Sequence, residues 1–448
     1  MSTPAVDHYL AQFSARRAEL PGRGIEWLDQ SRERALDAFA SSGFPTPRQE
    51  SWKYTRVAPI EKRNFDIARA NGIELRRADL ERYFLDTIEC EQLVFVDGRY
   101  MDSLSRRSSP DDGVRITTLE NAVDATPEFL ESHLGRYARV SGQPFSALNT
   151  AFMSDGAIVH VDNRGERTPT VDRPIHLLFL ATREDVVAHP RILVVAEPAT
   201  RVTVIESYAG LADGCYFSNA LTEIVVMEGA EVDHYKLQEE SLQAFHVATL
   251  EVRQERASKF ASHSISFGGR LVRNDINVLQ NAEGARSTLN GLFMVNGRQH
   301  VDFHTCIDHA KPNGASEETY KGILDGHARG VFNGRVKVHP DAQKTDAHQS
   351  NKNLLLSRNA EIDTKPELEI YADDVKCSHG ATVGQLDEQS LYYLRSRGIG
   401  EREARGLLTY GFARDILDRV ELVALQQKLT GELLERMPNA DQIREMVG

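Results

Sequence analysis

The 448-residue sequence predicts a mainly β protein whose central part is a solenoid of stacked β coils, flanked by helical regions at both ends. Short runs rich in β-branched residues follow one another from about residue 145 to about residue 384, without helical periodicity. A turn with a small residue recurs in this stretch at intervals of about 30 residues, as in a solenoid. A sandwich or jelly roll, with turns about every 8–12 residues, is the alternative. The recurring turns contain Ala199, Ala230, Ala257, Ala285, Ala328 and Ala360.

Residues 1–144 are predicted to form a helical region with short strands. Apolar side chains at steps of three and four, from Leu28 to Phe39, predict a helix that Gly43 ends. The run 93–96 followed by Asp97-Gly98 predicts a β-hairpin.

Residues 145–384 are predicted to form the β core, because each apolar run is bounded by Gly, Asn, Asp or Pro. Residues 385–448 are predicted to form a small helical domain. Asp387 is expected to cap its first helix, which ends at Gly398. The predicted strands of the core include residues 158–161, 192–195, 202–205, 224–227, 250–252, 336–338 and 368–370.

The composition argues against several classes of protein. Hydrophobic residues make up 41% and charged residues 27%, which are globular values. The net charge of −13 repels phosphate backbones, so no nucleic-acid partner is expected. No apolar run approaches the ~18 residues of a membrane span and no signal peptide is recognised, so a cytoplasmic protein without membrane contact is expected. Four cysteines without a CxxC motif suit a reducing compartment.

Two histidine–cysteine groups are candidates for metal chemistry, since imidazole and thiolate are ligands for iron, zinc or copper. The first comprises His300, His304, Cys306 and His309, of which His304 and Cys306 would share one face of a strand. The alternative for this group is that the histidines pack inside a coil and hydrogen-bond to the backbone.

The second group is Cys377 and His379, which would also share a face, with Asp373 and Asp374 nearby. Lys376 is expected to lower the pKa of the Cys377 thiol if it lies close. Two ligands make an incomplete site, which favours completion by a partner chain or a transient metal. The alternative is a solvated loop at the end of the solenoid. No phosphate-binding loop or GxSxG motif is present, so no catalytic residue is predicted.

Residues 359–384, which include Cys377 and His379, closely resemble the SufB/SufD family of iron–sulfur cluster assembly proteins, as do residues 393–399. Shorter matches lie at residues 51–55, 145–152, 304–305 and 331–334. The resemblance implies a right-handed parallel β-helix flanked by helical regions. It also implies a cytosolic complex with a SufB-like subunit and two copies of a SufC-like ABC-type ATPase, which would bind the nucleotide. Within the family, the lack of a cysteine before Thr364 and the Gly380 that follows His379 favour the SufD type.

The same resemblance implies a non-catalytic scaffold. Cys377 and His379 would lie at the interface with the SufB-like subunit and help to admit iron or complete a nascent cluster. By the same resemblance, this chain alone would bind no cofactor stably and reduced flavin would be a possible ligand of the complex; no flavin motif is found in the sequence. The C-terminal helices would dock the ATPase through Ala404, Leu408 and Phe412, for which the core of the helical domain is the alternative.

Other functions remain open at the level of the sequence. A β-helix enzyme acting on acidic polysaccharide would usually carry a secretory signal and would be disfavoured by the charge of −13. A purely structural tether for the ATPase, with Cys377 and His379 inert, is also open. An unpaired solenoid edge would serve a homodimer as well as a heterocomplex.

Overall fold

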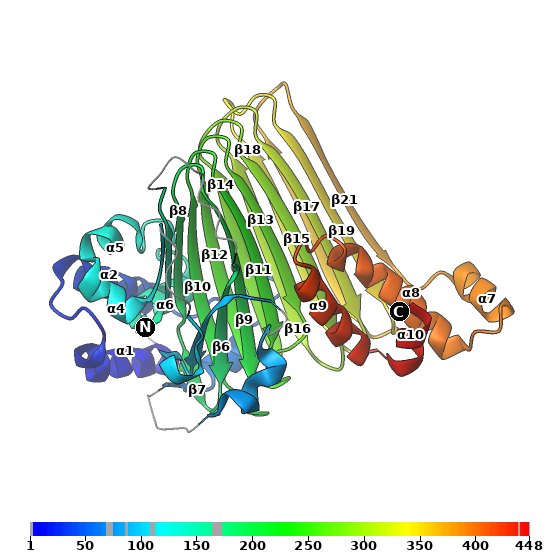
Figure 1. The fold of residues 1–448 in the computed structure, drawn as a ribbon, viewed down its shortest axis with the longest axis horizontal. Helices are drawn as coiled ribbons and strands as arrows, with labels where there is room; N and C mark the ends of the chain where they lie inside the picture. The colour runs from blue at the N-terminus through cyan, green and yellow to red at the C-terminus, as the bar shows by residue number, and fades with distance from the viewer. Residues whose placement is uncertain are drawn as a thin grey trace.

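The computed structural model describes residues 3–68, 75–85, 88–107, 113–163, 173–437 and 440–447. Two sheets wind into a parallel β-solenoid, and helices flank it at both ends (Figure 1). The predicted fold class, mainly β with a parallel β-helix between helical regions, is confirmed. The described helices are α1 (Pro4–Arg16), α2 (Glu26–Ser42), α3 (Ala58–Glu61), α4 (Leu119–Ala125), α5 (Pro127–His133), α6 (Pro144–Phe152), α7 (Glu388–Ser396), α8 (Glu401–Leu417), α9 (Val423–Glu435) and α10 (Ala440–Val447), with 3₁₀ turns at Arg17–Glu19, Glu50–Trp52, Arg77–Tyr83 and Asp102–Leu104.

The strands divide between two sheets, here named sheet A and sheet B. Sheet A contains β1 (Asp66–Ile67), β4 (Val114–Thr118), β5 (Gly156–Val161), β7 (Val186–Ala188), β8 (Arg191–Ala196), β10 (Phe217–Val226), β12 (Phe245–Gln254), β14 (Leu271–Gln280), β16 (His300–His309), β18 (Arg329–Val338) and β20 (Glu361–Ile370). Sheet B contains β2 (Glu91–Val96), β3 (Arg99–Tyr100), β6 (Ile175–Ala181), β9 (Arg201–Gly210), β11 (Glu231–Glu239), β13 (Lys259–Ser266), β15 (Arg286–Val295), β17 (Ala315–Leu324), β19 (Asp346–Leu355) and β21 (Lys376–Gly384).

Each turn of the solenoid contributes one strand to each sheet. In sheet B, Glu231 pairs in parallel with Arg201 of the turn before and with Lys259 of the turn after, so one turn takes about 30 residues. There are about seven such turns. The predicted period is therefore confirmed. A sandwich or jelly roll would have paired antiparallel strands instead.

The small residues that recur in the sequence lie at the corners between the sheets. Ala199 and Ala257 have φ angles of 58° and 55°, a left-handed conformation in which a small side chain is tolerated best. At the equivalent corners Gly229 and Gly284 take this conformation, at 65° and 73°, and the next residue is a fully buried alanine. The regular use of small residues therefore reflects a tight corner that repeats once per turn.

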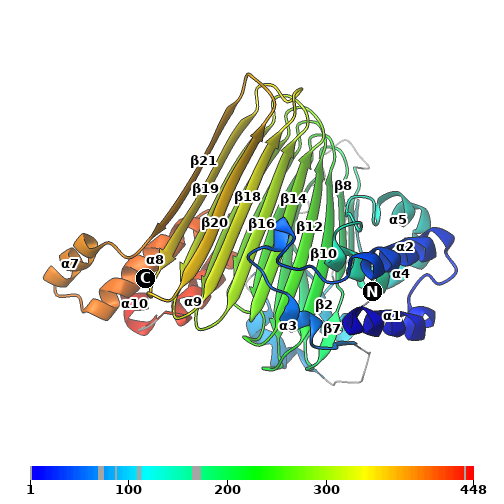
Figure 2. The ribbon, with the colours of Figure 1, turned by 180° about the vertical axis from the view of Figure 1, so that it is seen from behind.

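Helices cover part of the outer face of each sheet. The outer face of sheet B, including Ile265 and Leu292, packs against α8, α9 and α10. The outer face of sheet A, including Phe217 and Phe245, packs against α1, α2 and α6. From behind, the segment around α3 is seen to cross sheet A (Figure 2). Within the described residues, no helix has both the length and the apolar composition required to cross a bilayer.

Several elements match the sequence-based prediction. Helix α2 buries Leu28 and Phe39 and ends at Gly43. Strands β2 and β3 form the predicted hairpin, with Asp97 and Gly98 both at positive φ. Asp387 caps α7 by accepting a hydrogen bond of 2.7 Å from the backbone N–H of Ser390. The hairpin lies in the predicted helical region, and β2 and β4 both join the solenoid sheets.

The expectation that helical structure stops at residue 145 is wrong, because α6 occupies Pro144–Phe152. All nine residues of α6 are buried, so the helix has no polar face from which a period of 3.6 could be recognised. The buried polar side chain of Asn149 is satisfied by hydrogen bonds, because its amide NH₂ donates to the carbonyls of Pro190 and Asn219 at 2.8 Å each.

A buried ion pair anchors the loop before α6 to the first turns of the solenoid. Arg191 Nη2 lies 2.5 Å from Glu223 Oε2, and both side chains are fully buried. Glu223 also accepts hydrogen bonds from the backbone N–H groups of Gly135, Tyr137 and Ala138. The Glu223 carboxylate therefore forms an ion pair with the guanidinium and accepts hydrogen bonds from three backbone amides.

Replacing this carboxylate should destabilise the protein strongly. Glu223→Ala leaves a buried guanidinium without its counter-ion, which typically costs about 3–5 kcal/mol. We expect a large fall in the urea midpoint, measured by circular dichroism. Glu228→Ala is the control, because Glu228 pairs with Arg256 on the surface and should contribute about 1 kcal/mol or less. Equal shifts of the urea midpoint in the two variants would contradict the conclusion that the Arg191–Glu223 ion pair stabilises the fold.

Candidate functional site

The last turn of the solenoid is open. Strands β20 and β21 are the terminal strands of sheets A and B, and among the described residues each forms its ladder with one neighbour only, β18 and β19 respectively. Both strands lie at one end of the solenoid in Figures 1 and 2. Ile370, Tyr371 and Val383 are large apolar side chains exposed at this end. The inner faces of both sheets are therefore accessible here.

Cys377 and His379 both lie on the inner face of this open turn. In β21, Cys377 pairs with Ala347 and His379 pairs with Gln349, and both partners are buried inside the solenoid. Cys377 is half-buried against the apolar cluster around Val336, whereas His379 is exposed. The predicted common face of the two side chains is confirmed.

The thiol of Cys377 is held in its neutral form. Burial, and next the negative charge of Asp346, raise the pKa of Cys377 above its ordinary value. Lys376 does not contribute to this pKa, because adjacent strand residues point to opposite faces, so the closeness on which its expected effect depended is not found. Asp374 forms an ion pair with Lys344. Among the described residues, no three His, Cys, Asp or Glu side chains form a group that could hold a metal.

The other histidine–cysteine group is divided between the two faces of β16. His304 and Cys306 share the outer face of sheet A, as predicted, and Arg335 donates to Cys306 Sγ at 3.5 Å. His309 is fully buried on the opposite face, with Nε2 2.9 Å from Ser316 Oγ. The buried interpretation therefore holds for His309. His300 lies at the start of the strand beside Thr55.

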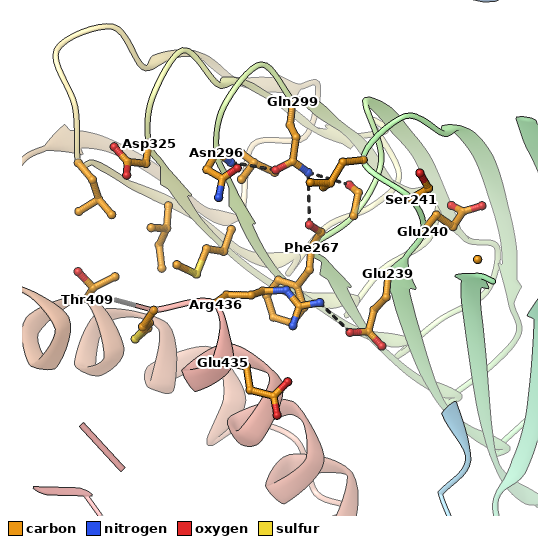
Figure 3. Close-up of a pocket in the computed structure, with 18 of the residues that line it drawn as sticks. Glu239, Glu240, Ser241, Phe267, Asn296, Gln299, Asp325, Thr409, Glu435 and Arg436 are labelled. Atoms are coloured by element: carbon orange, nitrogen blue, oxygen red, sulfur yellow. Dashed lines mark hydrogen bonds and ion pairs between the residues drawn. The ribbon is translucent and has the colours of Figure 1, made fainter. Parts of the chain in front are cut away.

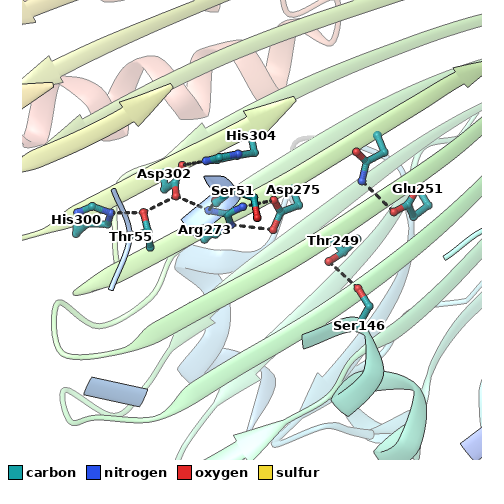
Figure 4. A network of polar contacts seen from close by, with 11 residues as sticks. Ser51, Thr55, Ser146, Thr249, Glu251, Arg273, Asp275, His300, Asp302 and His304 are labelled. Atoms are coloured by element: carbon teal, nitrogen blue, oxygen red, sulfur yellow. Dashed lines mark hydrogen bonds and ion pairs between the residues drawn. The ribbon is translucent and has the colours of Figure 1, made fainter. Parts of the chain in front are cut away.

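A polar network that the sequence did not predict centres on Asp302 (Figure 4). This fully buried carboxylate lies 2.8 Å from Arg273 Nη1 and 3.1 Å from His304 Nε2, and it accepts a hydrogen bond from the Thr55 hydroxyl. Burial alone would raise the pKa of Asp302, but the neighbouring His304 and Arg273 outweigh this effect and lower it. Arg273 also donates to the carbonyl of Ser51 and stacks on Trp52. The network fastens residues 51–55 to the outer face of sheet A.

A cavity of about 590 Å³ lies between the C-terminal helices and the solenoid (Figure 3). Arg436 follows α9 and lies 3.0 Å from Glu239 Oε1 at the end of β11, with its guanidinium 4.5 Å from the ring centre of Phe267. Burial, and next the neighbouring Glu432, raise the pKa of Glu239, while Arg436 opposes this effect.

The residues predicted to dock an ATPase lie on α8 in different environments. Ala404 is fully buried within this chain, so it is core. The ring of Phe412 lies 4.6 Å from Lys321 Nζ, which also donates to the Phe412 carbonyl. Leu408 is half-buried. Tyr392 and Tyr393 of α7, which no sequence pattern singled out, are 76% and 57% exposed.

Reaction of Cys377 with iodoacetamide should report its suppressed ionisation. Asp346→Asn removes a charge that disfavours the thiolate, so alkylation near neutral pH should become a few-fold faster, measured by peptide mass spectrometry. Asp341→Asn is the control, because Asp341 is an exposed aspartate in the turn before β19, and it should not change the rate. An unchanged rate in Asp346→Asn would exclude the proposed electrostatic effect.

Docking of the C-terminal helices should weaken at alkaline pH. The pKa of Glu239 is higher in the folded protein than in the unfolded chain, so the folded protein holds this proton to a higher pH. Protonation of Glu239 therefore stabilises the folded state fully at acid pH, and this stabilisation is lost as the pH rises through the elevated pKa. The melting temperature should therefore fall less in Glu239→Gln than in the wild type between about pH 5 and about pH 9. Glu435→Gln, at an exposed residue that lines the same cavity, should follow the wild type. Parallel pH profiles for all three proteins would contradict this prediction.

Comparison with known proteins gives consistent matches along the chain. Residues 179–412 match the family model of the SufBD core domain of SUF system FeS cluster assembly, and residues 4–177 match that of the SufBD N-terminal region. An iron–sulfur cluster assembly SufBD family protein of Synechocystis is 36% identical over 428 residues, 93% of each chain. SufD of Escherichia coli is 32% identical over 90% of this chain and 92% of its own, and SufD of Bacillus subtilis is 26% identical over 96% and 97%. The chain therefore belongs to the SufBD family of iron–sulfur cluster assembly proteins.

Proposed function

We propose that this chain is the SufD-like, non-catalytic scaffold subunit of a cytoplasmic complex with a SufB-like subunit and a SufC-like ATPase. Membership of the SufBD family supports a role in iron–sulfur cluster assembly. The observation that carries the more specific proposal is the open last turn, which holds a thiol and an imidazole on its inner face. Such a pair is chemically suited to iron but incomplete without ligands from another chain.

The free edges of β20 and β21 are the proposed surface for the SufB-like subunit. An unpaired strand offers a row of backbone N–H and C=O groups, which a strand of another chain can satisfy. Exposed apolar residues such as Tyr371 and Val383 would be covered in the same step. In the absence of that subunit, a second copy of this chain would be able to occupy the edges as a homodimer.

Iron, or a nascent cluster, is the proposed cargo at this interface. The imidazole of His379 is exposed, and imidazole is a common ligand of iron. Cys377 must first lose its proton, and its raised pKa opposes this step in the free chain. A nearby cation would favour the thiolate, so binding of iron and deprotonation of Cys377 would be coupled. We therefore assign His379 the leading role and Cys377 a supporting one.

The C-terminal helices are the proposed docking site for the ATPase. Leu408 and Phe412 are partly accessible on α8, and Tyr392 and Tyr393 add an aromatic surface on α7. Aromatic residues are enriched at the energetically dominant centres of interfaces. Ala404 would support α8 from inside rather than contact the partner, because it is fully buried.

The test is to count iron and acid-labile sulfide in the complex. This chain is co-expressed with its SufB-like and SufC-like partners, as wild type, His379→Ala and His348→Ala, and each complex is purified without oxygen. His379→Ala should lose most of the iron and sulfide at unchanged subunit stoichiometry. His348 is the matched control, because it is an exposed histidine on the adjacent strand that faces outward and contacts Ser378.

Each outcome decides between specific alternatives. Unchanged iron and sulfide in His379→Ala would favour the purely structural tether. Equal losses in both variants would indicate damage to β19 and β21 rather than loss of a ligand. If the wild type forms no complex with these partners, the proposed assembly is wrong.

A further inference from the structure

A second, smaller cavity lies at the opposite corner of the solenoid from Cys377, where strands of sheet A begin. Its volume is about 180 Å³. Residues 54–59 form one wall, and the starts of β12, β14, β16 and β18 form the other. His300, seen beside Thr55 in Figure 4, lies in this second wall. Four arginines contribute to the lining, namely Arg56, Arg270, Arg298 and Arg329.

The parallel register brings these arginines together. Leu271 pairs with His300, and His300 pairs with Arg329, so residues at this corner recur at the spacing of neighbouring strands, about 4.8 Å. Arg270 and Arg298 lie in the loops that lead into β14 and β16. Arg56 is held against the same corner because the adjacent Thr55 is 2.8 Å from His300 Nε2. Arginines from three turns and from the N-terminal segment thus line one cavity.

Among the described residues, three of the four arginines have no ion-pair partner, although the carboxylates of Asp302 and Asp363 lie near His300 at the same corner. Within the described part of the chain, Arg56, Arg270 and Arg298 form no ion pair, whereas Arg329 pairs with Glu361. Neighbouring like charges repel one another. The cluster stands out in a chain with a net charge of −13. All four arginines are exposed to solvent, so their guanidinium groups are available to an anion that enters the cavity.

The floor of the cavity is apolar. Phe245 and Leu271 line it and are only 2% and 5% exposed. Guanidinium groups recognise phosphate through pairs of parallel hydrogen bonds, which makes arginine the preferred residue for planar, bidentate recognition of this group. The volume suits a phosphate group with a small substituent, and it is below the range of about 300–1,000 Å³ that is common for larger ligands.

We propose that this cavity binds a small phosphate-bearing molecule, with the phosphate among the arginines and any apolar substituent on Phe245 and Leu271. The proposal is independent of the function assigned to Cys377 and His379, which lie at the other corner. It concerns a small molecule rather than a nucleic acid, because the charge is confined to one cavity.

The test is isothermal titration calorimetry of the full chain with inorganic phosphate and, separately, with phenyl phosphate, at constant ionic strength in a buffer free of phosphate and sulfate. Both probes should bind saturably to the wild type. Arg270→Gln/Arg298→Gln should weaken binding by about tenfold or more, because charge-assisted hydrogen bonds are lost. The control Arg286→Gln/Lys311→Gln removes the same charge from the opposite corners and should bind like the wild type.

Three results would overturn the proposal: no saturable binding of either probe, an equal loss in the control variant, or a lower melting temperature of Arg270→Gln/Arg298→Gln in the phosphate-free buffer. The last result would show that the arginines stabilise the fold rather than await a ligand. Tighter binding of phenyl phosphate would support the proposal and identify an organic phosphate as the ligand class. Equal or weaker binding of phenyl phosphate would support it with the inorganic anion as the ligand.

Discussion

Backbone hydrogen bonding between successive turns is the interaction on which the rest of this structure depends. Every strand in the middle of each sheet satisfies its N–H and C=O groups with the turn before and the turn after, in an unbroken parallel register. This register aligns equivalent residues of different turns, so a side chain is positioned by its place in the period rather than by its place in the chain. A row of small corner residues, a cluster of arginines and an inner face of alternating side chains all result from the same repetition.

The repetition also explains why the fold was predictable and some of the residues were not. The corner alanines and the β-branched runs carried the period of about 30 residues, and the caps at Gly43 and Asp387 were predicted from local chemistry alone. Helix α6 was missed because complete burial removes the polar face on which helix recognition relies. Recognising α6 as a helix requires knowledge of the residues that pack around it, and a local sequence pattern does not contain this information.

In the candidate sites too, a local pattern predicted some features, whereas others depend on residues far away in the sequence. Alternation within a strand correctly placed Cys377 with His379 and His304 with Cys306. It did not give the environment of these residues. The effect of Lys376 on the thiol required the two side chains to be close, and adjacent residues of a strand point to opposite faces. Asp302 and Arg273 are charged residues that the sequence would place in solvent, yet both are buried and satisfy each other and Thr55. Partners that lie more than 200 residues apart leave no local signal.

The attachment of residues 51–55 to β14 and β16 has a consequence for how the chain folds. Thr55 and Asp302 are separated by 247 residues, so the N-terminal segment has no binding surface until more than half of the chain has been synthesised and coiled. Contacts of such long range slow folding, because the loop must close before any contact is gained. During synthesis the apolar side chains of this segment, Trp52 among them, would remain exposed and would need protection from aggregation. The solenoid is thus able to grow turn by turn, whereas its N-terminal cover has to be added late.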